Sequence, residues 1–213
     1  MTNHHHIAVI GGTGKSGKYL VKKLLEKGFR IKMLLRNPDQ LELNHPAIEK
    51  VKGDARNPMD IALLLEGCTA VLSTLGQPKG EPPIFSTATS NVLNAMQKLK
   101  IKRYIVTTGL SVDTPNDHKR SEQVQEASDW MRANYEPTTG DKQVEYELLA
   151  QGHVDWTLVR LPLIEQTEVA KGVKISLEDC LGNHISATDL ANFLIEQLEN
   201  TEYIGQAPFI ASI

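Results

Sequence analysis

The chain has few aromatic residues and only two cysteines. Its 213 residues include four Phe, five Tyr and two Trp, so the core has to be built mainly from aliphatic side chains. Cys68 and Cys180 are far apart in the sequence and form no C-x-x-C pair, which argues against a disulfide framework or a metal site. This use of cysteine suits reduced thiols and leads us to expect a cytoplasmic protein.

Long apolar runs and a basic stripe are also missing. No run reaches the roughly 18 apolar residues of a membrane span, and the N-terminus lacks the pattern of a signal peptide. Lys and Arg number 23 against 26 Asp and Glu, which gives a net charge of −3. We therefore expect neither a membrane nor a nucleic acid as partner. The histidines His4–His6 are interpreted as a solvated lead-in and not as a metal site.

Short apolar segments alternate along the chain with segments whose apolar residues recur at helical spacing. Strands are expected at 7–10, 31–35, 48–51, 70–73, 104–107, 156–160, 173–177 and 208–211. Helices are expected at about 17–27, 60–66, 86–99, 141–151 and 187–198, the last with Ser186 and Asp189 as a capping box. This order predicts an α/β fold: a Rossmann-like, doubly wound parallel sheet with helices on both faces and a small C-terminal cap. One domain is expected to span residues 1–213.

The stretch at about 112–140 has a different character, because it is polar and rich in charge. Val124, Ala127 and Met131 follow helical spacing within it. We expect an exposed helix flanked by loops, which would serve as a substrate lid, as a partner surface or simply as a surface helix.

A glycine-rich turn joins the first expected strand to the first helix. Gly11, Gly14 and Gly17 are spaced G-x-x-G-x-x-G, which lets a pyrophosphate approach the backbone N–H groups at a helix N-terminus. The Gly14-Lys15 pair imitates an ATPase P-loop. That loop needs a glycine at position 9, where this chain has Val9 inside the strand, so ATP hydrolysis is disfavoured.

The residue at the end of the second strand bears on the choice of dinucleotide. An acid there would accept hydrogen bonds from the adenosine ribose, whereas this chain has Arg36. A guanidinium suits a 2′-phosphate, and Lys15 would add a second cation. NADPH is therefore expected in preference to NADH.

Six motifs come in the order seen in atypical short-chain dehydrogenase/reductases. They are GGTGKSG at 11–17, LLRNP at 34–38, KGDA at 52–55, STLG at 73–76, TTGLS at 107–111 and DWTLVRLP at 155–162. Within that group the chain most resembles the NmrA-like NAD(P)H-binding set, which includes flavin reductases of the biliverdin reductase B type. The resemblance covers nearly the whole chain and is weakest at 112–140.

The resemblance, together with the glycine turn, implies a set of cofactor-binding residues at the carboxyl ends of the strands. They are Gly11, Thr13, Gly14, Lys15, Ser16, Gly17, Arg36, Asp54, Ala55, Thr74, Leu75, Gly76, Thr108, Pro162 and Leu163. Asp54 would lie near the adenine, Thr108 would flank the nicotinamide, and Pro162 with Leu163 would cover its ring.

The usual short-chain reductase has a Tyr four residues before a Lys, and this pair is missing from the expected place. Lys142 occupies the position of the basic residue, and Thr138 stands where the Tyr would be. The only Tyr-x-x-x-Lys pair, Tyr19 with Lys23, lies in the first helix and is interpreted as packing. Ser111 and Lys142 remain as candidate catalytic groups, with His153 as a conceivable proton donor.

An enzyme without that tyrosine suits an acceptor that takes its proton from solvent. A flavin or similar conjugated acceptor is of this kind, because the enzyme mainly has to hold two rings face to face. We therefore expect an NADPH-dependent oxidoreductase that acts on a small molecule, as a monomer or small homo-oligomer. The alternative is a non-catalytic, dinucleotide-sensing regulatory protein of the NmrA type. A nucleotide-sugar epimerase is disfavoured by the missing pair and by the short tail.

Overall fold

The computed structural model describes residues 6–41, 43–117 and 121–213. His4 and His5, and Lys119 and Arg120 of the polar stretch, lie outside the described residues. The strands are β1 (His6–Ile10), β2 (Arg30–Leu35), β3 (Ile48–Lys52), β4 (Cys68–Ser73), β5 (Arg103–Gly109), β6 (Asp155–Leu161), β7 (Leu163–Glu165), β8 (Val173–Ser176), β9 (His184–Ser186) and β10 (Phe209–Ser212). The helices are α1 (Gly17–Glu26), α2 (Pro58–Leu65), α3 (Phe85–Leu99), α4 (Glu122–Asn134), α5 (Glu136–Gln151) and α6 (Ala187–Glu196), with a short 3-10 helix, η1 (Pro38–Gln40).

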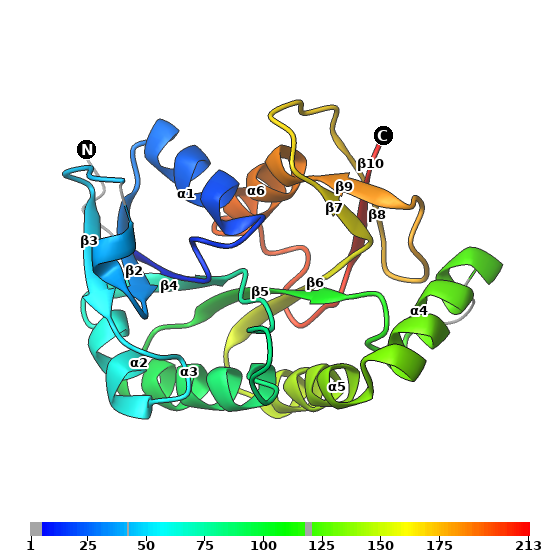
Figure 1. The fold of residues 1–213 in the computed structure, drawn as a ribbon, viewed down its shortest axis with the longest axis horizontal. Coiled ribbons are helices and arrows are strands. Elements are labelled where there is room, and N and C mark those ends of the chain that lie inside the picture. The colour runs from blue at the N-terminus through cyan, green and yellow to red at the C-terminus, as the bar shows by residue number, and fades with distance from the viewer. Residues whose placement is uncertain (1–5, 42, 118–120) are drawn as a thin grey trace.

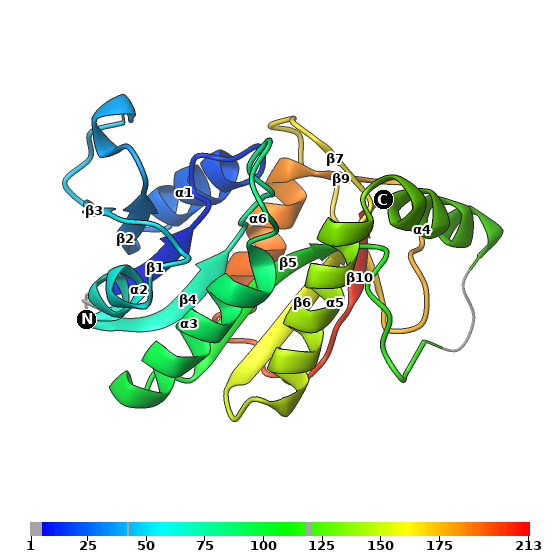
Figure 2. The same ribbon diagram turned by 60° about the horizontal axis from the view of Figure 1, so that its bottom comes forward.

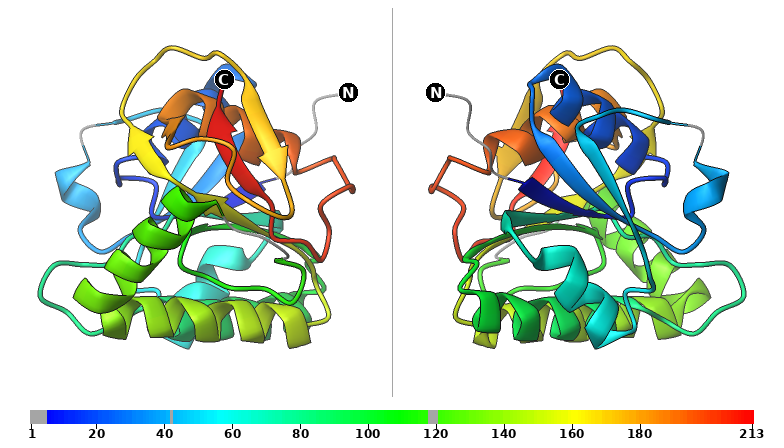
Figure 3. Two further views of the ribbon diagram at one scale, coloured as in Figure 1. Left: turned by 90° about the vertical axis from the view of Figure 1, so that its right-hand side faces the viewer. Right: turned by 90° about the vertical axis from the view of Figure 1, so that its left-hand side faces the viewer.

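Eight of the strands form one sheet in the order β3-β2-β1-β4-β5-β6-β10-β8. Neighbouring strands are parallel, except that β8 runs antiparallel to β10. Helices α1 and α6 cover one face, and α2, α3 and α5 cover the other (Figure 1). Figure 2 shows α3 and α5 side by side along the sheet, and Figure 3 shows the three layers from the ends. The expected doubly wound, Rossmann-like fold is confirmed.

Burial on both faces explains why central strands such as β1 are apolar along most of their length. On β1, Ile7 and Val9 belong to the core beneath α1 and α6, whereas Ala8 and Ile10 belong to the core above α2 and α3. Successive side chains of a strand point to opposite faces, so both sets must be apolar.

The boundaries and inward faces of some elements differ from the sequence expectation. Helix α5 begins at Glu136, ahead of the expected start near 141, because Pro137 fits the first helical turn. The helix expected in the polar stretch is α4, on which Val124 is buried and Met131 half-buried as the spacing indicated, whereas Ala127 is exposed and Ser128 is buried instead. The short two-stranded sheet of β7 and β9 was not predicted, since three-residue strands give no readable alternation.

The N-terminus of α6 confirms only half of the expected capping box. The Ser186 hydroxyl accepts hydrogen bonds from the N–H groups of Thr188 and Asp189, at 3.2 and 3.4 Å. Asp189 does not return a bond to the Ser186 N–H. That N–H instead donates to Ser212 Oγ at 2.9 Å, and the Ser212 hydroxyl donates to Asp189 at 2.7 Å. The cap therefore ties α6 to strand β10.

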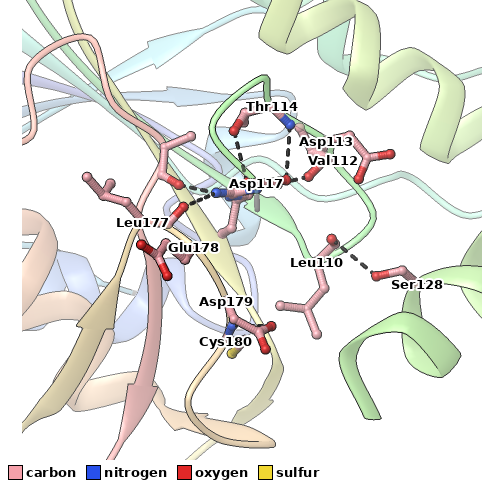
Figure 4. Close-up of polar contacts among 12 residues, drawn as sticks. Leu110, Val112, Asp113, Thr114, Asp117, Ser128, Leu177, Glu178, Asp179 and Cys180 are labelled. Atoms are coloured by element: carbon pink, nitrogen blue, oxygen red, sulfur yellow. Dashed lines mark hydrogen bonds and ion pairs between the residues drawn. The ribbon is translucent and has the colours of Figure 1, made fainter. Parts of the chain in front are cut away.

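A buried arginine near the carboxyl end of β6 contacts several segments that are distant in the sequence. Arg160 is 1% exposed, and its Nη1 lies 2.7 Å from both carboxylate oxygens of Asp117. Its Nε donates to Ala207 O at 2.8 Å, and its guanidinium carbon lies 3.5 Å from the centroid of the Phe209 ring. Figure 4 shows Asp117 held in turn by Thr114, whose N–H and hydroxyl donate to it.

Removing the carboxylate of Asp117 is expected to destabilise the fold strongly. The substitution Asp117→Ala leaves the Arg160 charge buried without its carboxylate, which typically costs about 3 to 5 kcal/mol of the free energy of unfolding. Urea denaturation at neutral pH measures the loss. The control is Glu26→Ala, which breaks the exposed ion pair with Lys23 on α1 and should cost far less. Equal losses in the two variants would contradict a structural role for the Arg160 pair.

Candidate functional site

A cleft of about 480 Å³ opens where strands β1 to β4 end. This is the place where the strand order reverses, between β1 and β4, and where doubly wound sheets bind their ligands. Several of the expected cofactor-binding residues line it, namely Gly11, Thr13, Gly14, Arg36, Asp54, Ala55, Leu75 and Gly76. The cleft is therefore built where the sequence motifs predicted it.

The glycine turn forms one wall of the cleft and is closed by main-chain contacts. Gly11 has φ +79°, and its carbonyl accepts a hydrogen bond from Gly14 N at 3.0 Å. A Cβ on Gly17 would lie 2.0 Å from Gly11 O, so no larger residue fits there. Lys15 is exposed and Ser16 is buried, and α1 begins at Gly17. The turn thus presents a helix N-terminus to the cleft.

Thr74 fixes the end of β4 against this turn. Its N–H donates to Ile10 O at 2.9 Å, and its hydroxyl donates to Gly11 O at 3.3 Å. A Cβ on Gly11 would lie only 2.6 Å from Thr74 O, so the glycine is required by the close approach as well as by its φ. The two strand ends at the reversal point are held together in this way.

Two acidic residues and two arginines lie at the other end of the cleft. Asp54 accepts a hydrogen bond from Arg56 N at 2.8 Å, so it also caps its own loop. Arg36 Nη1 lies 2.6 Å from Glu81 Oε1, and Arg56 Nη1 lies 2.9 Å from Glu81 Oε2. Neither Arg56 nor Glu81 was singled out in the sequence, because Glu81 belongs to a loop without a motif.

The two candidate catalytic side chains both lie near Gly109, at the end of β5. A methyl group at Gly109 would lie 3.8 Å from Lys142 Nζ and 4.0 Å from Ser111 Oγ. Lys142 Nζ also lies 4.7 Å from the centroid of the Phe85 ring. Desolvation lowers the pKa of Lys142, and the Glu145 carboxylate partly offsets this effect. Thr108, one residue before Gly109, is buried, and its hydroxyl has no hydrogen-bond partner among the described residues.

A buried carboxylate beside this pair was missed in the sequence. Glu145 is 2% exposed, and its Oε1 accepts a hydrogen bond at 2.7 Å from the hydroxyl of Thr89, which lies 3.1 Å from the hydroxyl of Tyr104. Its Oε2 is buried with no partner among the described residues. Desolvation raises the pKa of Glu145 to about 7. The i,i+3 spacing to Lys142 on one helix face is the signal that would have found it.

Other expected residues lie elsewhere. His153 precedes β6 and lies at the opposite edge of the sheet from Ser111, because β5 and β6 are parallel, so the hypothesis of a proton donor there was wrong. Pro162 separates β6 from β7, and Leu163 is 74% exposed at the start of β7. Tyr19 packs against the core beneath α1, as expected.

The raised pKa of Glu145 predicts a pH-dependent stability. The folded state binds the proton more tightly than the unfolded state, so the stabilisation is present below about pH 4.5 and is lost as the pH rises through about 7. Glu145→Gln stays uncharged and escapes this loss. Relative to the wild type, the variant should therefore gain up to about 3 kcal/mol of unfolding free energy between pH 5 and pH 8. Urea denaturation at the two pH values measures the difference, and a difference that does not change with pH would contradict it.

Among the described residues no helix is long and apolar enough to cross a membrane, and no cluster of His, Cys, Asp or Glu has the form of a metal site.

Parts of the chain are similar in sequence to known reductases and dehydrogenases. The chain is 26% identical over 136 residues to cinnamoyl-CoA reductase 1 of Arabidopsis thaliana, which covers 58% of this chain and 40% of that protein. It is 29% identical over 124 residues to 3-beta-hydroxysteroid dehydrogenase of Mycolicibacterium neoaurum, which covers 52% of this chain and 34% of that protein. The chain thus spans less than half the length of these two relatives.

Solved structures share the fold over nearly the whole chain. The oxidoreductase ylbE of Lactococcus lactis has a TM-score of 0.77 at 18% identity, covering 98% of this chain and 91% of its own. A short-chain dehydrogenase/reductase of Veillonella parvula, solved in complex with NADP, has a TM-score of 0.77 at 13% identity, covering 98% and 94%. A family model described as NAD(P)H-binding matches residues 11–201. The chain therefore belongs to this NAD(P)H-binding family, as the resemblance in its motifs implied.

Proposed function

We propose that the chain is an NADPH-dependent reductase that transfers hydride to a flavin or a similar conjugated acceptor, as NmrA-like flavin reductases do. The observation that carries the proposal is the arrangement of the carboxyl edge of the sheet. Arg36 lines the cleft at the glycine turn, and Ser111 and Lys142 both lie near Gly109 at the end of β5, two strands away from β1.

The residues present fit a dinucleotide. Side chains at Gly11 and Gly17 would clash with the main chain around the turn, so the two glycines allow the close turn that brings the N-terminus of α1 to the cleft. The cleft volume of about 480 Å³ suits the adenosine half. In this proposal Thr13, Gly14, Lys15 and Ser16 bind the pyrophosphate, and Asp54 and Ala55 lie at the adenine. Thr74, Leu75 and Gly76 line the path from the adenosine to the nicotinamide. Thr108, Pro162 and Leu163 border the nicotinamide.

The reacting side of the proposed site has a threonine in place of the tyrosine that short-chain reductases use as their acid. Helix α5 carries Thr138 one turn before Lys142, where a short-chain reductase would have its tyrosine. Reduced nicotinamide supplies a hydride, and a flavin accepts it together with a proton from water. Ser111 and Lys142 then have only to orient the nicotinamide ribose and the acceptor, which their place beside Gly109 allows.

The acceptor is tested by following NADPH oxidation with FMN, FAD, riboflavin, quinones and conjugated carbonyl compounds. Turnover is expected with free flavins, and Lys142→Met should lower kcat about tenfold by loosening the orientation of the two rings. Lys98→Met, which removes an exposed lysine at the end of α3, is the control and should leave kcat unchanged. NADPH binding without turnover on any acceptor would contradict the proposal and favour a dinucleotide sensor.

Cofactor preference is tested at Arg36. Arg36→Ala should raise the KM for NADPH by about tenfold, since a charge-assisted contact to the 2′-phosphate is lost, and should leave the KM for NADH nearly unchanged. Arg30→Ala is the matched control, because Arg30 is exposed at the opposite end of the same strand. Equal effects of Arg36→Ala on both cofactors would overturn the preference for NADPH.

A further inference from the structure

Two arginines from different strands converge on one carboxylate at the rim of the cleft. Arg36 follows β2 and Arg56 follows β3, and each places an Nη1 on a different oxygen of Glu81, at 2.6 and 2.9 Å. Asp54 Oδ2 lies further away, 3.5 Å from Arg56 Nη1. Glu81 is therefore the principal anion held by both guanidinium groups.

The connection between β4 and α3 is folded so that it places Glu81 there. The side-chain amide of Gln77 donates to the carbonyls of Pro78, Glu81 and Pro82, at 3.1, 2.8 and 3.1 Å. Arg56 Nη2 also donates to Pro82 O, at 3.1 Å. Gly80, with φ +75°, makes the turn just before the glutamate. The contact therefore belongs to an ordered loop whose prolines restrict its backbone.

A carboxylate that bridges two guanidinium groups makes the kind of contacts that a phosphate monoester would make. Both anions accept paired N–H bonds from arginine, and the phosphate carries the larger charge. Arg36 and Asp54 line the cleft that the proposed function assigns to the adenosine half of the cofactor.

We propose that Glu81 is a specificity-determining residue, which competes with the 2′-phosphate of NADPH for Arg36 and Arg56. The inference rests on the proposed function, and it adds Arg56 as the second arginine of the 2′-phosphate subsite. The ion pairs are partly exposed, at 53% for Arg36 and 38% for Glu81, so water and salt weaken them and a dianion can displace the carboxylate. Glu81 therefore reduces the preference for NADPH that the two arginines would otherwise give.

The test measures the binding of two cofactor fragments by calorimetry, independently of any turnover. Adenosine 2′,5′-bisphosphate carries the 2′-phosphate, and 5′-AMP lacks it. Glu81→Gln should bind the bisphosphate about fivefold to tenfold more tightly than the wild type, and 5′-AMP within about twofold of the wild type, because only the former meets the freed arginines. Glu168→Gln is the matched control, since Glu168 is also exposed and ion-paired, but its partner Lys22 does not line the cleft, whereas Arg36, the partner of Glu81, does.

The outcomes separate this inference from the proposed function. Unchanged or weaker binding of the bisphosphate by Glu81→Gln overturns the competition. If the gain is real, it should disappear when Arg36→Ala is combined with Glu81→Gln, because the released donor is then missing. If the wild type binds both fragments equally, the expected preference for NADPH is wrong. If only Glu81→Gln binds the bisphosphate more tightly than 5′-AMP, the competition is still supported.

Discussion

The close approach of three main-chain segments, at Gly11, Gly17 and Thr74, is the constraint on which the rest of the site depends. The carbonyl of Gly11 lies where a side chain on Gly17 would be, and Thr74 bonds to both Ile10 and Gly11. This contact joins the start of α1 to the ends of β1 and β4, on either side of the point where the strand order reverses. The position of the cleft and of its rim follows from this contact. The contact also fixes how far the cleft lies from the end of β5, because the ends of neighbouring parallel strands lie along one edge of the sheet.

The parts that the sequence predicts well are those encoded by local signals. The central strands are largely apolar because both faces are covered, Gly17 is required by a contact within the motif itself, and Gly11 has a positive φ that glycine adopts readily. Ser186 caps α6 through groups two and three residues away. Ser111 and Lys142 come from distant positions in the sequence, and both lie near Gly109 at the end of β5. Their chemical roles remain predictions.

The parts that the sequence does not predict depend on contacts between distant segments. Arg160 looks like one residue of a strand motif, and only the fold shows that it is buried against Asp117 and Phe209. Glu145 reads as an ordinary helical glutamate until α3 and β5 bury it against Thr89 and Tyr104. Asp189 satisfies the spacing of a capping box, yet Ser212 takes its place at the Ser186 N–H because β10 comes within reach. In each case a partner far away in the chain decides what the side chain does.

The position of β10 has a consequence for the order in which the sheet is assembled. It is the last described strand in the chain, yet it lies between β6 and β8. Strand β8 pairs in this sheet with β10. Arg160 can contact Ala207 and Phe209 only after the segment that contains them has joined the sheet. During synthesis the strands from β1 to β6 are available long before, so β6 presents an unpaired edge for as long as β10 is missing. The rate at which β10 joins the sheet therefore determines how long the open edge of β6 in a nascent chain can pair with strands of other chains.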